Sequence, residues 1–433
     1  MTPTLVARVR TALTTFTAWL DAFGETSFDH QSFYAGPVGG RAKSLYYRRP
    51  LIGTVAVAPM VLCEAFAPAA RRLWYRPPRF PIADAHFAMG HAFLYEASGD
   101  SASLTRAIHF LNILEKTRCL SFQEYCWGYP FDWVTRNGVI KAQTPLITTT
   151  PYVFEAFLQI SQLPEPAQHQ ITAEQRQAWT DILSSIVRHA RTDIKDFGTS
   201  AVASSCSYTP FDGGGVVNAA AYRAFLLTSA ARLFDCEEYW KVAERNVNFV
   251  LEAQNADGSW PYAVDGVRDF VDHFHTCFVM KALAKIHSLT GHEGCFKALS
   301  RSINYYRSQL FDTDGLPKPF AKAPRLTVYK RELYDCAECI NLCLLLQDRF
   351  PMLSETLDTV VDEITSHWIK PDGSFRSRRL LIGWDNIPMH RWGQSQMFRS
   401  LAFYLAQAQV KQTAATPASK SVPPYALTGN VGH

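Results

Sequence analysis

Five stretches of the chain repeat one pattern at intervals of roughly 60 residues. In each, a loop with aromatic, glycine or proline residues leads to a polar helix start and then to an apolar helix. A unit of this kind needs neighbours to bury its apolar side, so the repeat constrains the fold more than any single residue. The loops and helix starts are Trp127–Phe131 with Thr150–Phe154, Tyr208–Phe211 with Asn218–Tyr222, Gly258–Tyr262 with Phe274–Phe278, Gly315–Pro319 with Leu333–Ala337, and Gly373–Phe375 with Trp392–Gln396.

Two kinds of helix are expected to alternate along the chain. Helices that are apolar nearly all round are buried, and helices with one charged face are peripheral. The expected inner helices are Ile82–Tyr95, Thr150–Ile160, Asn218–Leu233, Phe274–His287, Leu333–Leu346 and Trp392–Leu405. The expected outer helices are Leu104–Thr117, Glu174–Ala190, Glu238–Ala253, Gly294–Leu310, Leu353–Ile369 and, as the sixth, Thr54–Phe66.

This alternation predicts an all-α fold, an (α/α)6 toroid of six helical hairpins that closes on itself. Short extended pieces at Arg325–Tyr329 and Phe375–Ile382 should decorate the loops. We divide the chain into an N-terminal helix and extended segment packed on the toroid (1–52), the toroid (53–410), and a flexible tail (411–433) that lacks apolar periodicity. Met1–Phe23 has apolar residues at helical spacing and is interpreted as a packing helix.

Charge and hydropathy argue against several classes of protein. The 433 residues include 43 basic and 39 acidic ones, and this balance, with no Lys/Arg run, argues against nucleic acid as a partner. Arg71-Arg72 and Arg378-Arg379 are interpreted as solvated or local pairs. No apolar run of about 18 residues suggests a membrane span, and the N-terminus lacks signal-peptide features.

The ten cysteines lie mostly within apolar helical patterns, where thiols behave as small hydrophobes. We therefore expect a reducing cytoplasm. Cys336, Cys339 and Cys343 form a C-x2-C-x3-C string, which would suit a metal. On a helix these steps also give one apolar face, and a core stripe is the preferred interpretation.

Several strings resemble known toroid families. Gln254–Trp260 resembles the Q-x-x-D-G-S-W element of squalene/hopene cyclases and six-hairpin glycosidase-like proteins. From about Phe80 to Leu405 the chain is similar to bacterial toroid proteins associated with polysaccharide biosynthesis, through Trp127–Trp133, Thr144–Leu146, Asp272–Thr276 and Arg391–Gln394. Asp272–Thr276 also looks like a D-Y-H-T string in the helical domain of glucuronyl C5-epimerases. The resemblance implies a toroid that acts on a glycan, with polysaccharide-biosynthesis proteins as candidate partners.

Asp272 and His275 open the fourth inner helix. A carboxylate beside an imidazole suits proton transfer near neutral pH. The alternative is that Asp272 caps the helix and His275 is hydrogen-bonded in the core. His273 and His275 could hold a metal, but residues two apart on a helix diverge and no third ligand is evident. We expect no metal and no cofactor.

Glu332, Asp335 and Glu338 follow one another at three-residue steps on the next inner helix. Carboxylates buried side by side acquire different pKa values, which suits an acid and a base. Asp132, Asp212 and Asp385 are further acid candidates from loops. The candidate catalytic set is therefore Asp272, His275, Glu332, Asp335 and Glu338, and all five should lie near one cavity.

Aromatic and basic side chains at the same end should bind substrate. Aromatic rings stack on the apolar faces of sugars, although they would equally pack against isoprenoids or roof the core. Arg325, Arg331 or Arg391 could pair with a uronate carboxylate. The candidate binding set is Trp127, Tyr129, Asp132, Trp133, Tyr208, Asp212, Trp260, Tyr262, Arg331, Trp384, Arg391 and Trp392.

The leading hypothesis is a carbohydrate-active enzyme that uses acid–base chemistry on a bacterial polysaccharide or oligosaccharide, by hydrolysis, elimination or uronate epimerisation. One alternative is a non-catalytic glycan-binding or assembly protein of a polysaccharide pathway, for which the aromatics alone would suffice. A terpene cyclase is disfavoured because its D-x-D-D string is absent. The nearest acidic cluster, Asp235–Glu238, precedes an outer helix.

Overall fold

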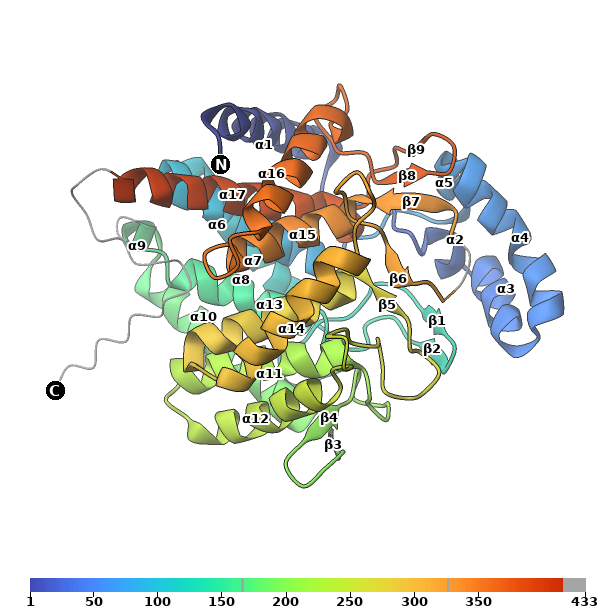
Figure 1. Cartoon of the computed structure of the whole chain (residues 1–433), viewed down its shortest axis with the longest axis horizontal. Helices are drawn as coiled ribbons and strands as arrows, with labels where there is room; N and C mark the ends of the chain where they lie inside the picture. Colours follow the sequence, from blue (N-terminus) through green and yellow to red (C-terminus); the bar gives the residue numbers. More distant parts are fainter. Residues whose placement is uncertain (165–166, 325–326, 416–433) are drawn as a thin grey trace.

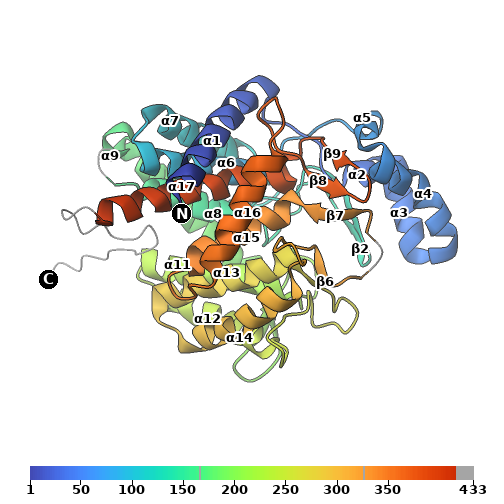
Figure 2. The same ribbon diagram turned by 45° about the horizontal axis from the view of Figure 1, so that its top comes forward.

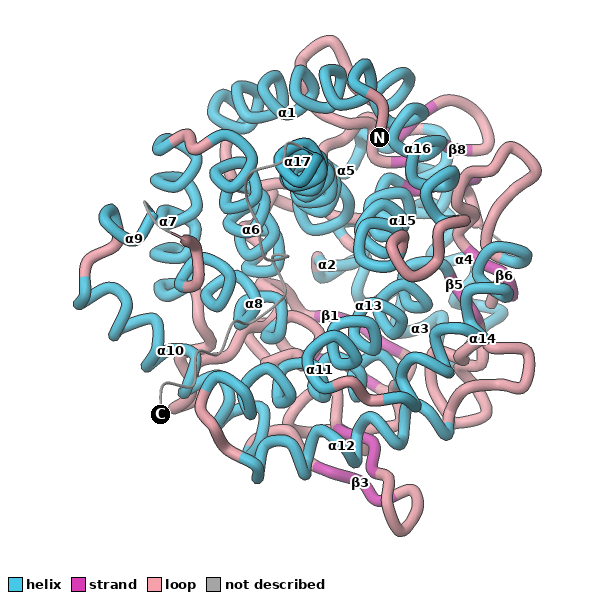
Figure 3. The backbone as a smooth tube through the Cα atoms, turned by 60° about the vertical axis from the view of Figure 1, so that its left-hand side comes forward, coloured by secondary structure: helices cyan, strands magenta, loops and turns pink. Residues whose placement is uncertain are grey.

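The helices form a closed ring, which Figure 3 shows nearly end-on. The computed structural model describes residues 1–164, 167–324 and 327–415. Each inner helix packs against the next, and the last packs against the first, which closes the ring. The inner helices are α6 (Pro81–Ser98), α8 (Thr150–Ser161), α11 (Val217–Leu233), α13 (His273–Thr290), α15 (Leu333–Leu346) and α17 (Ser395–Ala415). The (α/α)6 toroid predicted from the repeat is confirmed.

Outer helices cover this ring. They bury one apolar face and expose charge on the other, which fits their position between core and solvent. The outer helices are α7 (Ser101–Lys116), α10 (Ala173–Thr192), α12 (Glu237–Glu252), α14 (Glu293–Gln309), α16 (Leu353–Glu363) and α1 (Pro3–Phe23). The sixth outer helix is therefore α1, and the prediction of Thr54–Phe66 for that place was wrong.

Two equivalent turns show why α1 takes the sixth place. Asp257-Gly258-Ser259 and Asp372-Gly373-Ser374 each have a glycine with φ near +90° and a serine N–H bonded to the aspartate. A Cβ on Gly258 would lie 2.6 Å from the carbonyl oxygen of Arg301 in α14. A Cβ on Gly373 would lie 2.6 Å from the carbonyl oxygen of Thr15 in α1. The same glycine turn thus seats α14 and α1 against the ring.

The strands are short, antiparallel and confined to the loops. The pairs are β1 (Trp133–Thr135) with β2 (Gly138–Ile140), β3 (Asp196–Gly198) with β4 (Ser204–Cys206), and β5 (Val271–Asp272) with β6 (Phe320–Lys322). The remaining sheet has three strands, in the order β7 (Tyr329–Glu332), β8 (Arg378–Leu380) and β9 (Trp384–Asp385). The extended piece predicted over Phe375–Ile382 is confirmed through β8, and Arg325 lies outside the described residues.

Residues 32–74 form an arm that projects beside the strands at the right of Figures 1 and 2. Its elements are α2 (Ser32–Ala35), α3 (Pro37–Arg48), α4 (Pro50–Phe66), η1 (Pro68–Ala70) and α5 (Arg71–Trp74). We expected an extended segment up to residue 52 and the ring from residue 53. The structure instead has a helical hairpin, because prolines open both α3 and α4 with the fixed φ of a first helical turn.

Several buried groups complete the core. Arg71 and Arg378 are buried, with Arg71 paired to Asp385 at 2.7 Å, so only Arg72 and Arg379 fit the prediction of solvated arginines. Cys336, Cys339 and Cys343 lie on one buried face of α15, which confirms the predicted core stripe. α17 continues to Ala415, so residues 411–415 are helical where we expected the tail to begin, and 416–433 lie outside the described residues.

Candidate functional site

The inner helices begin at the end of the ring where the loops and strands lie, and we call this end, with the first turns of the inner helices, the mouth. Aromatic and ionisable side chains contact one another along this mouth in an unbroken arc. Ring or cation–π contacts join Tyr208 to Trp133, Tyr129, Arg391, Trp392, Phe274, His275 and Tyr262 in that order. The sequence placed all but Phe274 in the candidate site, and the structure brings these residues together.

Asp272 and His275 form the pair at the start of α13. Asp272 is the N-cap, and one of its oxygens accepts the backbone N–H of His275 at 3.0 Å. The other oxygen lies 2.6 Å from Nδ1 of His275. Asp272 is buried, whereas the His275 side chain is 22% exposed, and within the described chain Nε2 has no hydrogen-bond partner. Both interpretations of Asp272 therefore hold at once: it caps the helix and it orients the imidazole.

Arg391 and Trp392 are fixed by residues from the N-terminal segment. Arg391 donates to both oxygens of Asp29 at 2.9 and 2.7 Å and to the Tyr129 hydroxyl at 3.1 Å. Burial would raise the pKa of Asp29, but Arg391 and His30 together hold it far below its usual range. The Trp392 ring stacks on Tyr334 at 4.5 Å and lies 4.0 Å from His30. Burial lowers the pKa of His30 to about 4, so its ring is neutral at neutral pH.

Glu332 connects the mouth to the base of the arm. It accepts from Trp392 Nε1 at 3.1 Å and pairs with Arg378 Nε at 2.5 Å. Arg378 also pairs with Glu64 of α4 at 2.6 Å. Burial raises the pKa of Glu332, against the lowering effect of Arg378. Glu332 therefore holds Trp392 and Arg378 in place rather than facing solvent.

Asp335 is the least satisfied acid of the site. It is fully buried, and neither carboxyl oxygen has a hydrogen-bond partner within the described residues. Burial raises its pKa well above the usual value, and the negative charges of Glu332 and Asp272 raise it further. The sequence indicated that one carboxyl of this set would have a raised pKa, and Asp335 is such a group.

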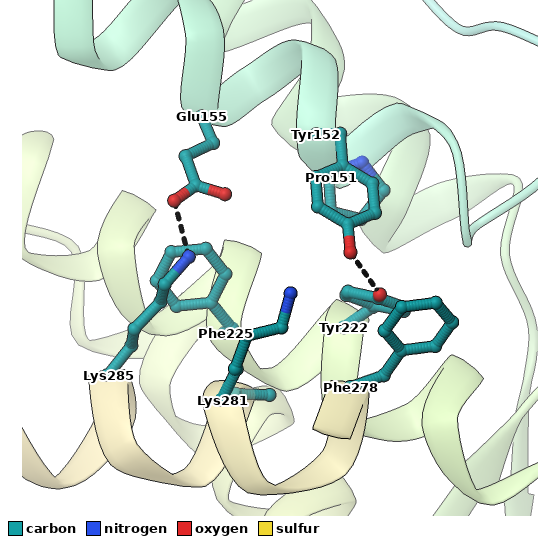
Figure 4. A pocket seen from close by; sticks show the side chains of 9 residues that line it. Pro151, Tyr152, Glu155, Tyr222, Phe225, Phe278, Lys281 and Lys285 are labelled. Carbon is teal, nitrogen blue, oxygen red and sulfur yellow. Dashed lines mark hydrogen bonds and ion pairs between the residues drawn. The ribbon is translucent and has the colours of Figure 1, made fainter. Parts of the chain in front are cut away.

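Glu338 lies deeper, in the lumen of the ring, where it pairs with Lys281. Figure 4 shows the neighbouring groups, with Lys285 reaching Glu155 and the hydroxyl groups of Tyr152 and Tyr222 meeting at 2.5 Å. Arg399 also bonds Glu155 at 3.1 Å. Burial would raise the pKa of Glu155, but Lys285 and Arg399 lower it to about 2. The cavity between these side chains is about 10 Å³, which admits roughly one water molecule.

Six predicted binding residues have structural partners instead of a place in the arc. The indole N–H groups of Trp127 and Trp260 donate to the carbonyl oxygens of Leu114 and Val250 in outer helices, so both rings roof the core. Trp384 packs against Trp368, and Arg376 and Arg379 lie over its ring.

The other three are polar residues bound within loops. Arg331 bonds Asp312 and Asp314 at 3.0 and 3.1 Å, away from the mouth. Asp132 accepts from Lys141 and from the Ala142 N–H. Asp212 accepts four bonds within its own turn. Asp385, a further acid candidate, is the buried partner of Arg71.

The structure adds residues that sequence reasoning missed. Asp29, His30 and Arg378 come from segments with no repeat signal, and only the folded chain brings them to the mouth. Lys281 and Phe274, by contrast, lie in sequence patterns from which their place in the site could have been predicted. A lysine in an otherwise apolar inner helix implies a buried partner, and Phe274 lies between His273 and His275 at the helix start.

Comparison with solved structures gives matches to sugar-modifying enzymes. An unsaturated glucuronyl hydrolase specific for heparin has a TM-score of 0.60 and 11% identity, over 94% of this chain and 98% of that chain. A cellobiose 2-epimerase from Bacillus thermoamylovorans has a TM-score of 0.58 and 10% identity, over 76% and 87%. An α-mannanase of glycoside hydrolase family 76 from Bacteroides thetaiotaomicron has a TM-score of 0.53 and 9% identity, over 77% of this chain and 87% of that chain.

No protein-family model matches the chain, and no curated protein sequence matches it. At these identities the structural matches establish the fold. Together with the six inner and six outer helices of the described chain, they show that the protein has the (α/α)6 toroid fold of the six-hairpin glycosidase-like proteins.

Proposed function

We propose that the protein is a carbohydrate-active enzyme in which His275, oriented by Asp272, transfers a proton at a sugar bound in the mouth. The observation that carries the proposal is the partly exposed imidazole, held at 2.6 Å by a buried carboxylate within an aromatic arc. An imidazole so held keeps its other ring nitrogen for the substrate. The rings of the arc offer flat apolar surfaces to a sugar.

Among the three reactions expected, proton transfer at carbon fits this site better than hydrolysis. Hydrolysis in most glycosidases uses two carboxyl groups that flank the bond. Here Glu332, Asp335 and Glu338 are all at most 1% exposed, and two of them pair with Arg378 and Lys281. We therefore favour epimerisation or elimination, with His275 as the base. The likeness to a cellobiose 2-epimerase supports epimerisation, whereas the likeness to an unsaturated glucuronyl hydrolase keeps hydrolysis as an outcome of the test.

Arg391 has a different role in this proposal from the one expected. Its guanidinium is bound by Asp29 and Tyr129, so pairing with a uronate carboxylate would require breaking buried bonds. We assign Arg391 as a positioning residue that holds Tyr129 and Trp392. Asp335 is assigned as a buried neighbour of Asp272, and its pKa is raised by burial and by the charges of Glu332 and Asp272.

The test compares His275→Asn and Asp272→Asn with the wild type on a panel of neutral and uronate-containing oligosaccharides. Solvent deuterium at a sugar carbon reports epimerisation, the absorbance of an unsaturated uronate reports elimination, and new reducing ends report hydrolysis. His275→Asn should lower kcat by roughly 10² to 10⁴-fold with little change in KM. His367→Asn is the matched control, since His367 pairs with Glu363 on the outer surface.

Wild-type turnover by the His275→Asn variant would refute the proposal. If the wild type bound a glycan without any turnover, the glycan-binding alternative would be favoured. The tightly paired carboxylates support that alternative, because they are engaged in ion pairs within the protein.

The proposal extends to cell location and partners. All ten thiols are unpaired, which suits a reducing compartment, and we infer a cytoplasmic protein. Among the described residues, no helix combines the length and apolar character needed to cross a membrane. We further propose an exopolysaccharide pathway and its biosynthesis proteins as partners. Cell fractionation and pull-down from cells that make such a polymer would test both points.

A further inference from the structure

The hairpin of α3 and α4 exposes an apolar stripe that no other described residue of the chain covers. On α4 the side chains of Leu51, Val55, Leu62 and Phe66 are 89%, 75%, 57% and 70% exposed. With Pro59 they recur at steps of three and four, so they share one face of the helix. From Pro50 to Cys63 the helix carries no charged residue.

The opposite face of α4 packs closely against α3. Gly53, Val57 and Met60 are buried there. A Cβ on Gly53 would lie 2.1 Å from the Cα of Tyr46, so the backbones of α3 and α4 touch at this point. The hairpin therefore presents its stripe outward from a close-packed pair of helices. Figures 1 and 2 show it projecting away from the ring.

Arginines border this stripe, and acidic residues are nearly absent. Between residues 32 and 80, all of them described, eight arginine and lysine residues accompany one acidic residue, Glu64. Glu64 is itself paired with Arg378. Five of the basic side chains are exposed, and none of them has an ion pair within the described chain. These five are Arg41, Arg48, Arg49, Arg72 and Arg76.

We propose that this hairpin docks the protein on an anionic lipid bilayer. A helix with one exposed apolar face inserts that face at the boundary between headgroups and acyl chains, and flanking arginines bind acidic headgroups. A protein partner or a second copy would bury the stripe equally well. The one-sided excess of unpaired arginines favours an extended, uniformly negative surface over either of them.

Docking in this way would place the mouth of the ring near the bilayer. The hairpin lies at the end of the ring where the inner helices begin (Figures 1 and 2). Its base is tied to that end through Glu64, Arg378 and Glu332. The proposal is independent of the reaction at His275, and its test requires no turnover.

The test is co-sedimentation of the full chain with vesicles of phosphatidylcholine alone and with added phosphatidylglycerol. Wild type should bind the anionic vesicles far more tightly, and added salt should weaken this binding. Arg48→Gln with Arg49→Gln should reduce binding to anionic vesicles roughly 30-fold, because each arginine near the surface contributes about fivefold. Leu51→Ser, Val55→Ser and Leu62→Ser together should reduce it more than roughly tenfold.

The matched control is Val139→Ser, Val202→Ser and Val267→Ser, three valines of the ring's loops that are 46%, 59% and 55% exposed. This variant should bind vesicles as the wild type does, and circular dichroism should show all variants folded. Equal binding to both vesicle types, or an equal loss in the control, overturns the proposal. The proposal is also overturned if the wild type is a dimer and the α4 triple variant is a monomer, because the stripe would then bind a second copy of the chain.

Discussion

The mouth and the lumen of the ring both contain acid–base pairs, but at different depths. At the mouth, Asp272 pairs with His275, whose ring reaches solvent. About two to three turns further along α13, Lys281 and Lys285 pair with Glu338 and Glu155 and are almost completely buried. Burial lowers the pKa of Lys285 to about 8, while Glu155 opposes the shift. A pair that solvent and ligand can reach is free to exchange protons, whereas the sealed groups hold the inner helices together.

The difference shows that composition alone does not identify the reactive groups of a toroid. Removing one partner of a buried pair leaves an uncompensated charge, so such groups resist change for reasons of stability. Substitutions in the lumen are thus expected to destabilise the protein even though these residues take no part in the reaction. Substitutions at the mouth should lower turnover rather than stability.

The largest effect on stability should come from breaking the lumen network. Lys281→Met keeps the length of the side chain but leaves Glu338 buried without its cation. We expect a loss of about 3–5 kcal/mol in the free energy of unfolding, measured by denaturant titration. Lys241→Met, which removes an exposed partner of Glu238, should cost less than about 1 kcal/mol. Equal losses would erase the distinction between sealed and exposed pairs.

Asp335 should make the free energy of unfolding depend on pH. Its pKa is raised in the folded state, so between the unfolded value near 3.8 and the raised value the folded chain binds more protons. Stability is therefore fully present below the unfolded value and decreases as pH rises through the folded pKa. Asp335→Asn should remove up to about 1.4 kcal/mol per pH unit from this slope. Unfolding measured across pH with unchanged slopes would contradict the assignment.

A smaller effect is expected at the rim of the mouth. Tyr129→Phe removes the hydroxyl that accepts from Arg391 but keeps the stacked ring. The loss should be about 1 kcal/mol by thermal unfolding. Tyr46→Phe in α3 is the control, because its hydroxyl has no hydrogen bond among the described residues, and it should change stability little. If Tyr129→Phe costs no more than the control, Arg391 does not depend on Tyr129.

The smallest effect should be that of chelation. We predict a metal-independent protein, because the chemistry assigned to His275 and Asp272 requires only proton transfer. Treatment with EDTA should leave both thermal unfolding and turnover unchanged. Loss of either property that zinc restores would show that a metal belongs to the mouth after all.

The repeat in the sequence predicted the ring well because each inner helix must be apolar all round. Five inner helices begin within one residue of their predicted positions, at Pro81, Thr150, Val217, His273 and Leu333. The last does not, because η3 (His390–Gln394) precedes α17 and Gly393 has φ +130°, which breaks the helix after Trp392. The sixth outer helix was assigned wrongly, since α1 and α4 both have apolar residues at helical spacing.

The candidate site was only partly legible in the sequence. Local patterns identified Asp272 and His275, because a cap and the residue it orients are close in the chain. Long-range partners such as Asp29 for Arg391 carry no pattern, since 362 residues separate them. Trp127 and Trp260 looked identical to exposed stacking rings until their N–H partners were known.

The position of α1 has a consequence for how the chain is made. Arg8 of α1 bonds Ser366 at a separation of 358 residues, and Phe16 stacks on Phe375 and Phe398. At ordinary rates of translation these partners leave the ribosome roughly 20 to 70 seconds after α1 does. α1 can therefore take its place as the sixth outer helix only after the last part of the ring has been synthesised. During that delay its apolar face is an opportunity for chaperones and a risk for misassembly.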